Sequence, residues 1–447
     1  MQHRRTILAI LSVFSVLFCL QFAGIGFPAL QAKSRPNISA TVALAAAAPR
    51  VAWKRFAKLT PSDGQIGDIF GSAVAIDGDV IVVGNETANI GRNIQQGAAY
   101  IFVKPSNGWQ DMTQTAKLTA SDGQYNDSFG HSVAIRGDTI AIGAYCHLAQ
   151  VGSCPGAVYV FKKPKTGWTD MTQTAELTAS DDHSQYGYDL GWSVAIGPDY
   201  TITSGAVASV NFAGAVYVFL KPPNGWRDKT QDAELTASDG QPADGLGNSV
   251  SYNGNTVAAG APNWPNGGSQ GAGYIYVKPS TGWETTTETA RFVDPDRRGG
   301  DYFANSVSLD ADADILGSGT PGATINGKYG QGAVYLFKKS NDDWKNAPAV
   351  KLTAFNGRAK DALGVAVSVE EFRTAAGASG YANNAGATYL YAKPTLGWKT
   401  TSMYNTRLTD VGGNFFGAAL ALKNNVLVVG AYLDYPGGAA YVYGPGD

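Results

Sequence analysis

One short phrase recurs seven times along this chain, and the repetition constrains the fold more than any other feature of the sequence. The phrase is Ala-Lys-Leu-Thr or a relative, found at 57–60, 116–119, 175–178, 233–236, 290–293, 350–353 and 406–409. Each copy is followed by Phe-Gly or a close variant, at positions 70, 129, 190, 246, 303, 363 and 416, so these pairs lie 53 to 61 residues apart. The chain is therefore a series of similar units, whereas its length alone would suggest about three domains.

Each unit predicts four β-strands, and the second unit shows the pattern most clearly. Residues 132–135 and 139–142 are β-branched, alternating runs on either side of the tight turn at 136–138. Residues 157–161 predict a third strand, and Gly167-Trp168 is expected to open a fourth, outer strand that closes at 176–178. Because four antiparallel strands repeated radially are typical of a propeller, the sequence predicts an all-β, seven-bladed β-propeller with four-stranded blades.

The two ends of the repeat region complement each other. The last unit stops after a third strand at 441–443, whereas Trp53 and residues 56–60 form a spare outer strand before the first unit. We therefore predict that the N-terminal strand completes the C-terminal blade, which closes the ring without an unpaired radial edge. The alternative is an open solenoid, which would need polar capping repeats at both ends.

Composition argues against several classes of protein. Glycine supplies 55 of the 447 residues and charged residues make up only 16 %, which disfavours helix bundles and coiled coils. The net charge of −2 provides no basic surface for nucleic acid. We expect a monomer without a nucleic-acid partner.

Residues 1–48 have a different composition from the repeats. Arg4 and Arg5 precede an almost uncharged, apolar stretch at 6–30, and Ala43-Leu44-Ala45 offers a small-residue cleavage site. This plan predicts a signal peptide, with an uncleaved N-terminal membrane anchor as the alternative. We expect the propeller to occupy residues 51–447 and to be secreted, periplasmic or held at the cell surface, with the membrane contacted only through such an anchor.

Export agrees with the cysteines. Beyond the leader only Cys146 and Cys154 remain, eight positions apart in a loop between two strand-like runs. In an oxidising compartment the pair predicts a disulfide that fixes this loop. The alternatives are free thiols or a metal site, but His147 alone does not supply the further ligands that zinc requires.

A small-residue corner follows the second strand of each unit, as in Gly143-Ala144-Tyr145 and Gly260-Ala261-Pro262. Phe-Gly followed by Gly-Ala-Pro is the phrase that names the FG-GAP repeat. Residues 51–447 resemble the FG-GAP repeats of exported bacterial proteins, which are related to the integrin α-subunit head. The resemblance implies a seven-bladed propeller that serves adhesion and ligand binding, with the blade loops as its contact surface.

The chain departs from integrin-type repeats in one respect. Those repeats often insert an acidic calcium loop between the first two strands, whereas this chain has short Asp-Gly and Asn-Gly hairpin turns, as at 76–80 and 252–255. Such turns cannot surround a cation that needs about six to eight oxygen ligands. The nearest approach is the run Asp310, Asp312 and Asp314, which is either a calcium site or a solvated acidic turn. We expect the turn, and no cofactor.

Candidate binding residues lie in the loops between second and third strands, which differ most between units, at 85–96, 145–155, 263–270 and 325–331. Variable loops on a rigid scaffold are where recognition usually occurs. We select Glu86, Tyr145, Asn263 and Trp264, the last because an exposed aromatic ring in such a loop can anchor a ligand.

Aromatic residues that recur in nearly every unit are interpreted as structural. The Gly-Trp tryptophans at 109, 168, 226, 283 and 398, and Trp344 in a weaker copy, are expected to pack between blades rather than to bind sugars. Trp192 and Trp264 fall outside this pattern. His131, which follows Phe129-Gly130, is also expected to be a packing residue.

The sequence favours a non-catalytic binding or adhesion module that recognises an extracellular protein or glycan. The alternative is a carbohydrate-active enzyme, a glycoside hydrolase or lyase, which would need inward-pointing acids such as Asp296 or Asp301. Such acids recur in pairs, as in Asp63 with Asp68, and are expected instead to bond the backbone of their own turns. The histidines at 131, 147 and 183 accompany no nucleophile motif.

Overall fold

The computed structural model describes residues 52–148, 154–180, 187–209, 213–296, 298–312, 314–341, 343–410 and 414–446. Contacts divide the chain into two units, Met1–Ala47 and Ala48–Asp447, and all described residues belong to the second. The expected leader at 1–48 and His183 lie outside the described residues. Within these residues, no helix has the length and apolar character needed to cross a membrane.

The second repeat forms a four-stranded antiparallel sheet in the order β7 (Phe129–Arg136), β8 (Thr139–Ala144), β9 (Cys154–Lys162) and β11 (Ala175–Thr178). The turn between β7 and β8 is tight because Gly137 adopts a φ of 56°. Every residue of β8 is buried, since neighbouring units cover both of its faces. This is the strand pattern that the alternating sequence predicts.

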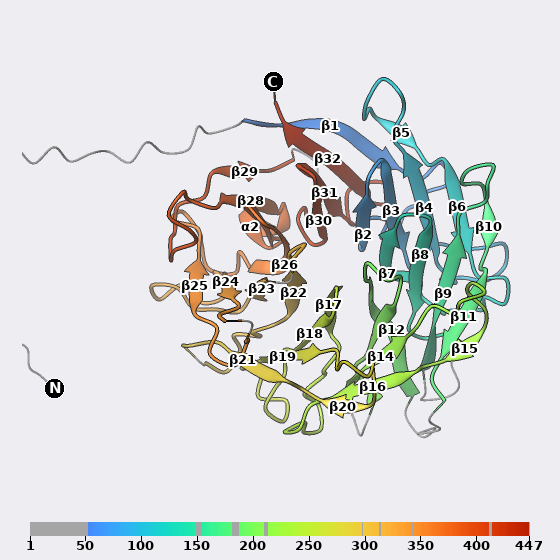
Figure 1. Cartoon of the computed structure of the whole chain (residues 1–447). Helices are drawn as coiled ribbons and strands as arrows, with labels where there is room; N and C mark the ends of the chain where they lie inside the picture. Colours follow the sequence, from blue (N-terminus) through green and yellow to red (C-terminus); the bar gives the residue numbers. More distant parts are fainter. Residues whose placement is uncertain are drawn as a thin grey trace, which may run out of the picture. The chain divides into compact units, whose positions relative to one another are not determined.

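The other repeats form similar sheets (Figure 1). Their strands are β2 (Val74–Asp77), β3 (Val80–Asn85), β4 (Ala98–Val103) and β6 (Ala116–Thr119); β12 (Gly187–Ile196), β13 (Ile202–Ala206), β14 (Ala215–Phe219) and β16 (Ala233–Thr236); β17 (Ser249–Asn253), β18 (Thr256–Ala261), β19 (Ala272–Val277) and β21 (Ala290–Val293). Two more sheets contain β22 (Ser306–Leu309), β23 (Ile315–Thr320), β24 (Ala333–Lys338) and β25 (Ala349–Leu352), and β26 (Leu363–Glu370), β27 (Arg373–Ala378), β28 (Ala387–Ala392) and β29 (Thr406–Leu408). A parallel pairing of β9 with β12 joins two of these units into one ten-stranded sheet.

The final sheet combines the two ends of the repeat region, as the sequence predicts. It contains β30 (Leu420–Lys423), β31 (Val426–Ala431), β32 (Ala439–Pro445) and the N-terminal strand β1 (Trp53–Thr60). β1 pairs antiparallel with β32, with Lys58 opposite Tyr441. The spare N-terminal strand therefore supplies the fourth strand of the last unit.

The segments after the Gly-Trp pairs differ from the prediction. They do not begin the fourth strand of their own unit, but form two-residue strands that cross to the unit before them. These strands are β5 (Met112–Thr113), β10 (Met171–Thr172), β15 (Lys229–Thr230) and β20 (Thr286–Thr287), and they pair in parallel with β1, β6, β11 and β16. Each such segment, here called a strap, links the outer edges of two consecutive sheets.

Hydrophobic clusters fill the spaces between consecutive units. In one of them Val82 and Ile101 of one unit meet Ile142 of the next, and Trp168 packs beside them. The remaining Gly-Trp tryptophans pack, buried or partly buried, in the corresponding clusters, at 109, 226, 283, 344 and 398. Their expected structural role is confirmed.

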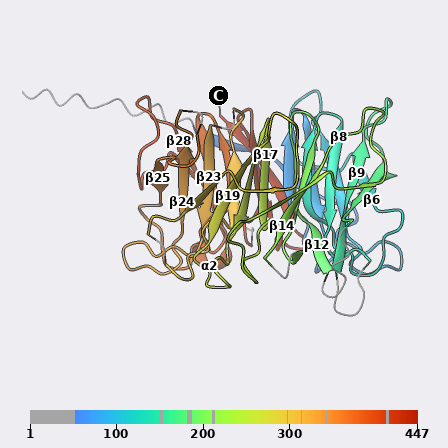
Figure 2. The same ribbon diagram turned by 60° about the horizontal axis from the view of Figure 1, so that its bottom comes forward.

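The innermost strands contact one another in a cycle within the described residues. β2 contacts β7, and the series continues through β12, β17, β22 and β26 to β30, which contacts β2. Figure 1 shows these strands around a common centre, and Figure 2 shows the sheets from another side, with α2 (Tyr381–Asn384) near one face.

A recurrent close approach fixes the spacing of consecutive sheets. A Cβ added to Gly84 would collide with the carbonyl oxygen of Gly130 in the next unit, and the same relation joins Gly430 to Gly71. The equivalent pairs are 143 with 191, 205 with 247, 260 with 304, 319 with 364 and 377 with 417. Glycine in the small-residue corner is therefore required because a neighbouring backbone occupies the space of a side chain.

Candidate functional site

The residue that follows each Phe-Gly pair lies at the start of an innermost strand and differs between units. In chain order these residues are Ser72, His131, Trp192, Asn248, Asn305, Val365 and Ala418. Only His131 and Trp192 carry rings, and they occupy the adjacent strands β7 and β12. The repeat is therefore broken on one side of the centre, where two neighbouring sheets present large side chains.

His131 and Trp192 form a cluster with two residues from the variable loops. The ring centroids of His131 and Trp192 are 4.8 Å apart, and Tyr145 lies 4.6 Å from the first and 5.1 Å from the second. The His131 Nδ1 lies 2.5 Å from a carboxylate oxygen of Glu86. These four residues are called the aromatic cluster below.

The aromatic cluster draws on three consecutive units. Glu86 follows β3 and Tyr145 follows β8, and both come two residues after the corner glycine of their unit. The side chains of Glu86 and His131 are 18 % and 22 % exposed, so a ligand can reach the pair. Burial raises the pKa of Tyr145, which keeps its hydroxyl protonated and able to donate a hydrogen bond.

Asp189, on β12, adds a second carboxyl group beside the aromatic cluster. Burial raises its pKa to about 6, although the nearby His131 acts in the opposite direction. The cluster therefore combines three rings, one acid paired with histidine and one acid whose ionised form is disfavoured. Perturbed carboxyl groups of this kind gather at functional sites more often than elsewhere.

Two of the four selected residues, Glu86 and Tyr145, are brought together in this cluster. His131 packs against Tyr145 and Trp192, as expected, and its partly exposed ring also pairs with Glu86. A signal for His131 and Trp192 was present in the sequence: both are large residues immediately after Phe-Gly, where other units have smaller ones.

Asn263 and Trp264 lie elsewhere, in the loop between β18 and β19. The Trp264 ring packs against the hydrophobic cluster of that unit and lies 4.9 Å from the Arg291 guanidinium. It is therefore partly buried rather than a freely exposed anchor. The backbone oxygens of both residues accept hydrogen bonds within their own loop, from Ser269, Gln270 and Gly271.

The paired carboxylates stabilise turns, as the sequence predicts. The second acid of a pair accepts a hydrogen bond from the backbone three residues earlier, as Asp68 does from Gln65 at 3.0 Å. The same bond recurs at Asp127, Asp244, Asp301 and Asp361. The first acid accepts bonds from a tyrosine and a basic residue, as Asp63 does from Tyr100 and Lys117. These groups form a framework that repeats around the molecule.

The acidic run at 310–314 also contains a turn of this kind. Asp310 is buried, and one of its carboxylate oxygens accepts hydrogen bonds from the backbone of Asp314 and Ile315 at 2.9 and 3.1 Å. Burial raises the pKa of Asp310. Asp312 and Asp314 are exposed. Asp310 therefore acts as the acceptor that holds the turn before β23.

The second unit contains a different group of polar residues around His147. Its Nδ1 lies 3.0 Å from Asp127, and its Nε2 lies 3.6 Å from a carboxylate oxygen of Asp122 and 3.6 Å from one of Glu176. Among the described residues, the ligand atoms of Asp122, His147 and Glu176 form a group that could hold a metal ion. Nothing in the sequence pattern links Asp122 and Glu176 to His147, because they lie 25 and 29 positions away in the chain.

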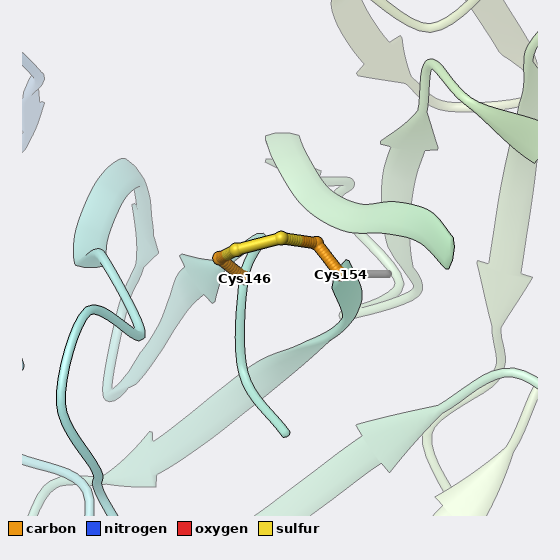
Figure 3. Close-up of a disulfide and its surroundings, with 2 residues drawn as sticks. All are labelled: Cys146 and Cys154. Carbon is orange, nitrogen blue, oxygen red and sulfur yellow. A yellow bond between two sulfur atoms is a disulfide. The ribbon is translucent and has the colours of Figure 1, made fainter. Parts of the chain in front are cut away.

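The expected disulfide is present next to this group. Cys146 and Cys154 are bonded, which ties the segment after β8 to the first residue of β9 (Figure 3). The bond fixes the position of His147, whose backbone oxygen also accepts a hydrogen bond from Gly156.

Comparison with protein-family models identifies the repeats. The FG-GAP repeat model matches residues 53–102, 112–161, 229–277, 286–337 and 410–443, which is more than half of the chain. The chain belongs to the FG-GAP repeat family. A search of the curated proteins found no match.

The FG-GAP repeats extend structurally beyond the matched segments. Residues 162–228 and 338–409 are not matched, yet they contain β12, β13 and β14 in one stretch and β26, β27 and β28 in the other, with the same antiparallel order. FG-GAP repeats are typical of propeller-type modules that bind other molecules. Trp192 of the aromatic cluster lies in one of these divergent stretches.

Proposed function

We propose that the repeats form a closed seven-bladed β-propeller with four-stranded blades and that the protein is a binding or adhesion module. The cycle of contacts from β2 to β30 and back supports closure, as does the pairing of β1 with β32. The corner-glycine contacts, which also return from the last unit to the first, lend further support. The aromatic cluster includes residues of two adjacent innermost strands, β7 and β12, so it lies on the inner side of the proposed ring.

The aromatic cluster is the proposed binding site for an extracellular protein or glycan. The observation that carries this proposal is its asymmetry: two adjacent inner strands present His131 and Trp192, whereas Val365 and Ala418 occupy the equivalent positions elsewhere. Ligand sites are typically lined by aromatic side chains with a few polar groups that fix orientation. The rings of Tyr145 and Trp192 beside the Glu86–His131 pair have this composition.

A matched pair of tyrosine variants tests the site. Tyr145 and Tyr432 occupy equivalent positions in two units, but Tyr432 stacks on Phe415, at a centroid distance of 5.1 Å, instead of joining the cluster. On a glycan array and a panel of extracellular proteins, Tyr145→Ala and Trp192→Ala should lose at least ~10-fold in affinity for any bound species. Tyr432→Ala should retain it. Equal effects of the two tyrosine variants would contradict the proposed location.

The alternative of a carbohydrate-active enzyme lacks a supporting observation. Asp296 accepts hydrogen bonds from Lys351 and Tyr335, and Lys351 holds the pKa of this carboxyl below its usual range, which makes it a poor general acid. Asp301 bonds the backbone of Arg298 like its counterparts in other units. Hydrolysis of a bound glycan, lost on Asp296→Asn, would favour the enzyme instead.

We also propose that the protein is exported to the periplasm, the medium or the cell surface. Support comes from the basic and apolar composition of residues 1–48 and from the disulfide, which is a bond typical of oxidising compartments. Cell fractionation with N-terminal sequencing distinguishes cleavage in the 43–48 region from retention of an anchor. Recovery of the intact chain in the cytoplasm would contradict export.

A further inference from the structure

We propose that Asp122, His147 and Glu176 bind one divalent transition-metal ion of the zinc class. The three ligand atoms lie within 4.8 Å of one another, and the His147 Nε2 is 3.6 Å from each carboxylate oxygen. In a tetrahedral zinc site with bonds of about 2.0 Å, ligand atoms are roughly 3.3 Å apart. The two distances from Nε2 exceed this value by a few tenths of an ångström, and the two carboxylate oxygens would approach each other by up to about 1.5 Å to complete this part of a coordination shell.

The histidine is oriented as a metal ligand. Its side chain is 2 % exposed, and its Nδ1 lies 3.0 Å from a carboxylate oxygen of Asp127, whose side chain is equally buried. A carboxylate that accepts a hydrogen bond from Nδ1–H fixes the tautomer and the orientation of the ring, so the lone pair of Nε2 points away from that carboxylate, as in zinc sites. Here Nε2 faces the space between Asp122 and Glu176, at a distance too long for a hydrogen bond to either.

In three other units a cation occupies the equivalent place beside the first acid of the turn, whereas the third unit has an acid there, Glu234. Position 176 corresponds to Lys117, Arg291 and Lys351, each of which forms an ion pair with the first acid of its turn. In the second unit that position carries Glu176, so an acid replaces the cation beside Asp122. The charged groups that act on Glu176 are Asp122, Asp127, Asp228 and His147, and His147 alone among them can be positive. A bound divalent ion would neutralise this excess of negative charge.

The surroundings hold the ligands in place and leave a route for entry. The Tyr159 hydroxyl donates to Asp122 Oδ1 at 3.2 Å, which leaves Oδ2 on the side of His147. The disulfide and the backbone bond from Gly156 fix the loop that carries His147. Asp122 is 41 % exposed, so the metal has access from solvent and a water molecule can complete the shell.

The ligand set argues for a transition metal rather than calcium. Calcium prefers six to eight oxygen ligands, whereas this group offers one imidazole nitrogen and two carboxylates. Imidazole suits zinc and its neighbours in the first transition series. The place also differs from the hairpin between first and second strands, because Asp122 precedes β7 and His147 follows β8.

Metal titration of the full chain tests the proposal. After removal of metal with a chelator, Zn²⁺ should bind with a stoichiometry of one against a competing chromophoric chelator, and Co²⁺ should give the visible spectrum of a site with four or five ligands. Glu176→Lys restores the residue type of Lys117 and Lys351, so the variant should fold but bind Zn²⁺ at least ~100-fold more weakly. His147→Gln should have the same effect, and Asp127→Asn should weaken binding by about 10- to 100-fold.

Three results would overturn the proposal. One is the absence of Zn²⁺ binding by the unaltered protein up to millimolar concentrations, which would leave protonated His147 as the cation of this group. A second is unchanged Zn²⁺ affinity in Glu176→Lys, with the variant shown to be folded by its circular dichroism spectrum and thermal transition. The third is a Co²⁺ spectrum that does not change when His147 is replaced.

Discussion

At the scale of single residues, the molecule is a regular framework with two local exceptions. The framework is made by residues that recur in each unit, such as the acid that bonds its own turn and the corner glycine that contacts the next sheet. The exceptions are the aromatic cluster and the group around His147. Both place polar or aromatic side chains where several other units have small or oppositely charged ones. These residues are therefore expected to distinguish this protein from others with the same repeats.

The carboxyl of Asp189 should make stability depend on pH. Its pKa is about 6 in the folded protein and about 3.9 in an unfolded chain, so the folded state binds more protons between these values. The contribution of Asp189 to stability is therefore most favourable below about pH 4, falls as the pH rises toward 6, and remains lower above it. Asn tolerates the positive φ of 55° at this position, so Asp189→Asn removes the charge without adding backbone strain.

The measurement is urea unfolding of both proteins across this pH range. The full shift corresponds to about 3 kcal/mol, and solvent screening of this partly exposed group reduces it, so Asp189→Asn should be more stable than the unaltered protein by about 2 kcal/mol at about pH 8. The difference should vanish below about pH 3. His131 and Tyr145 are titratable neighbours that interact electrostatically with Asp189. A difference that stays constant with pH would show that the Asp189 carboxyl titrates normally.

The sequence could identify part of the aromatic cluster and not all of it. Glu86 and Tyr145 could be predicted from the sequence because they lie in variable loops, where recognition is expected. His131 and Trp192 lie inside strands, and the contact between them depends on which strands are neighbours across the centre. The group around His147 could not be predicted for the same reason, because Asp122 and Glu176 come close to His147 only when a complete unit has folded.

At the scale of elements, the straps are the feature that sequence periodicity missed. The two-residue strands after the Gly-Trp pairs are too short to show an alternating pattern in the sequence, and their partner strands belong to another unit. The four main strands were predictable because alternation, turns and β-branched residues agree in each unit. The straps also use side chains: Asp170 accepts a bond from the backbone of Lys117, and Gln173 bonds both the backbone and the hydroxyl of Ser121.

Removal of one strap contact should weaken the junction between two sheets. Gln173→Ala deletes two hydrogen bonds of 3.0 Å to Ser121 in the preceding unit, and should lower the free energy of unfolding by about 1 kcal/mol. Gln241→Ala is the control, because that exposed glutamine takes part in its turn through its backbone N–H. Thermal or urea unfolding measures both variants, and equal stability of the two would show that the strap contributes nothing.

At the scale of the whole described molecule, β1 is the element on which the proposed closure of the ring depends. Leu59 of β1 and Leu177 of β11 occupy equivalent positions in their units, and both are fully buried. Leu59 lies in β1, whose partner β32 comes from the opposite end of the chain. Leu177 lies in β11, whose partner β9 belongs to the same continuous unit. The pair therefore compares the junction with an ordinary sheet.

If β1 is held as firmly as any other outer strand, Leu59→Ala and Leu177→Ala should destabilise the protein alike. Each leaves a cavity in a packed cluster, which costs about 2–5 kcal/mol. Urea unfolding and amide hydrogen exchange of β32 provide the measurements. A much smaller cost for Leu59→Ala, with rapid exchange along β32, would indicate that the ring opens at this junction.

The pairing of β1 with β32 also orders events during protein synthesis. A ribosome makes Trp53–Thr60 before the intervening units, and makes its partner Ala439–Pro445 only after them. The earlier units can assemble in sequence as they emerge, but the last sheet must wait for a strand made at the beginning. The antiparallel edge of β1 therefore stays unpaired until translation has passed Tyr441, and such an edge is open to other partners during that time.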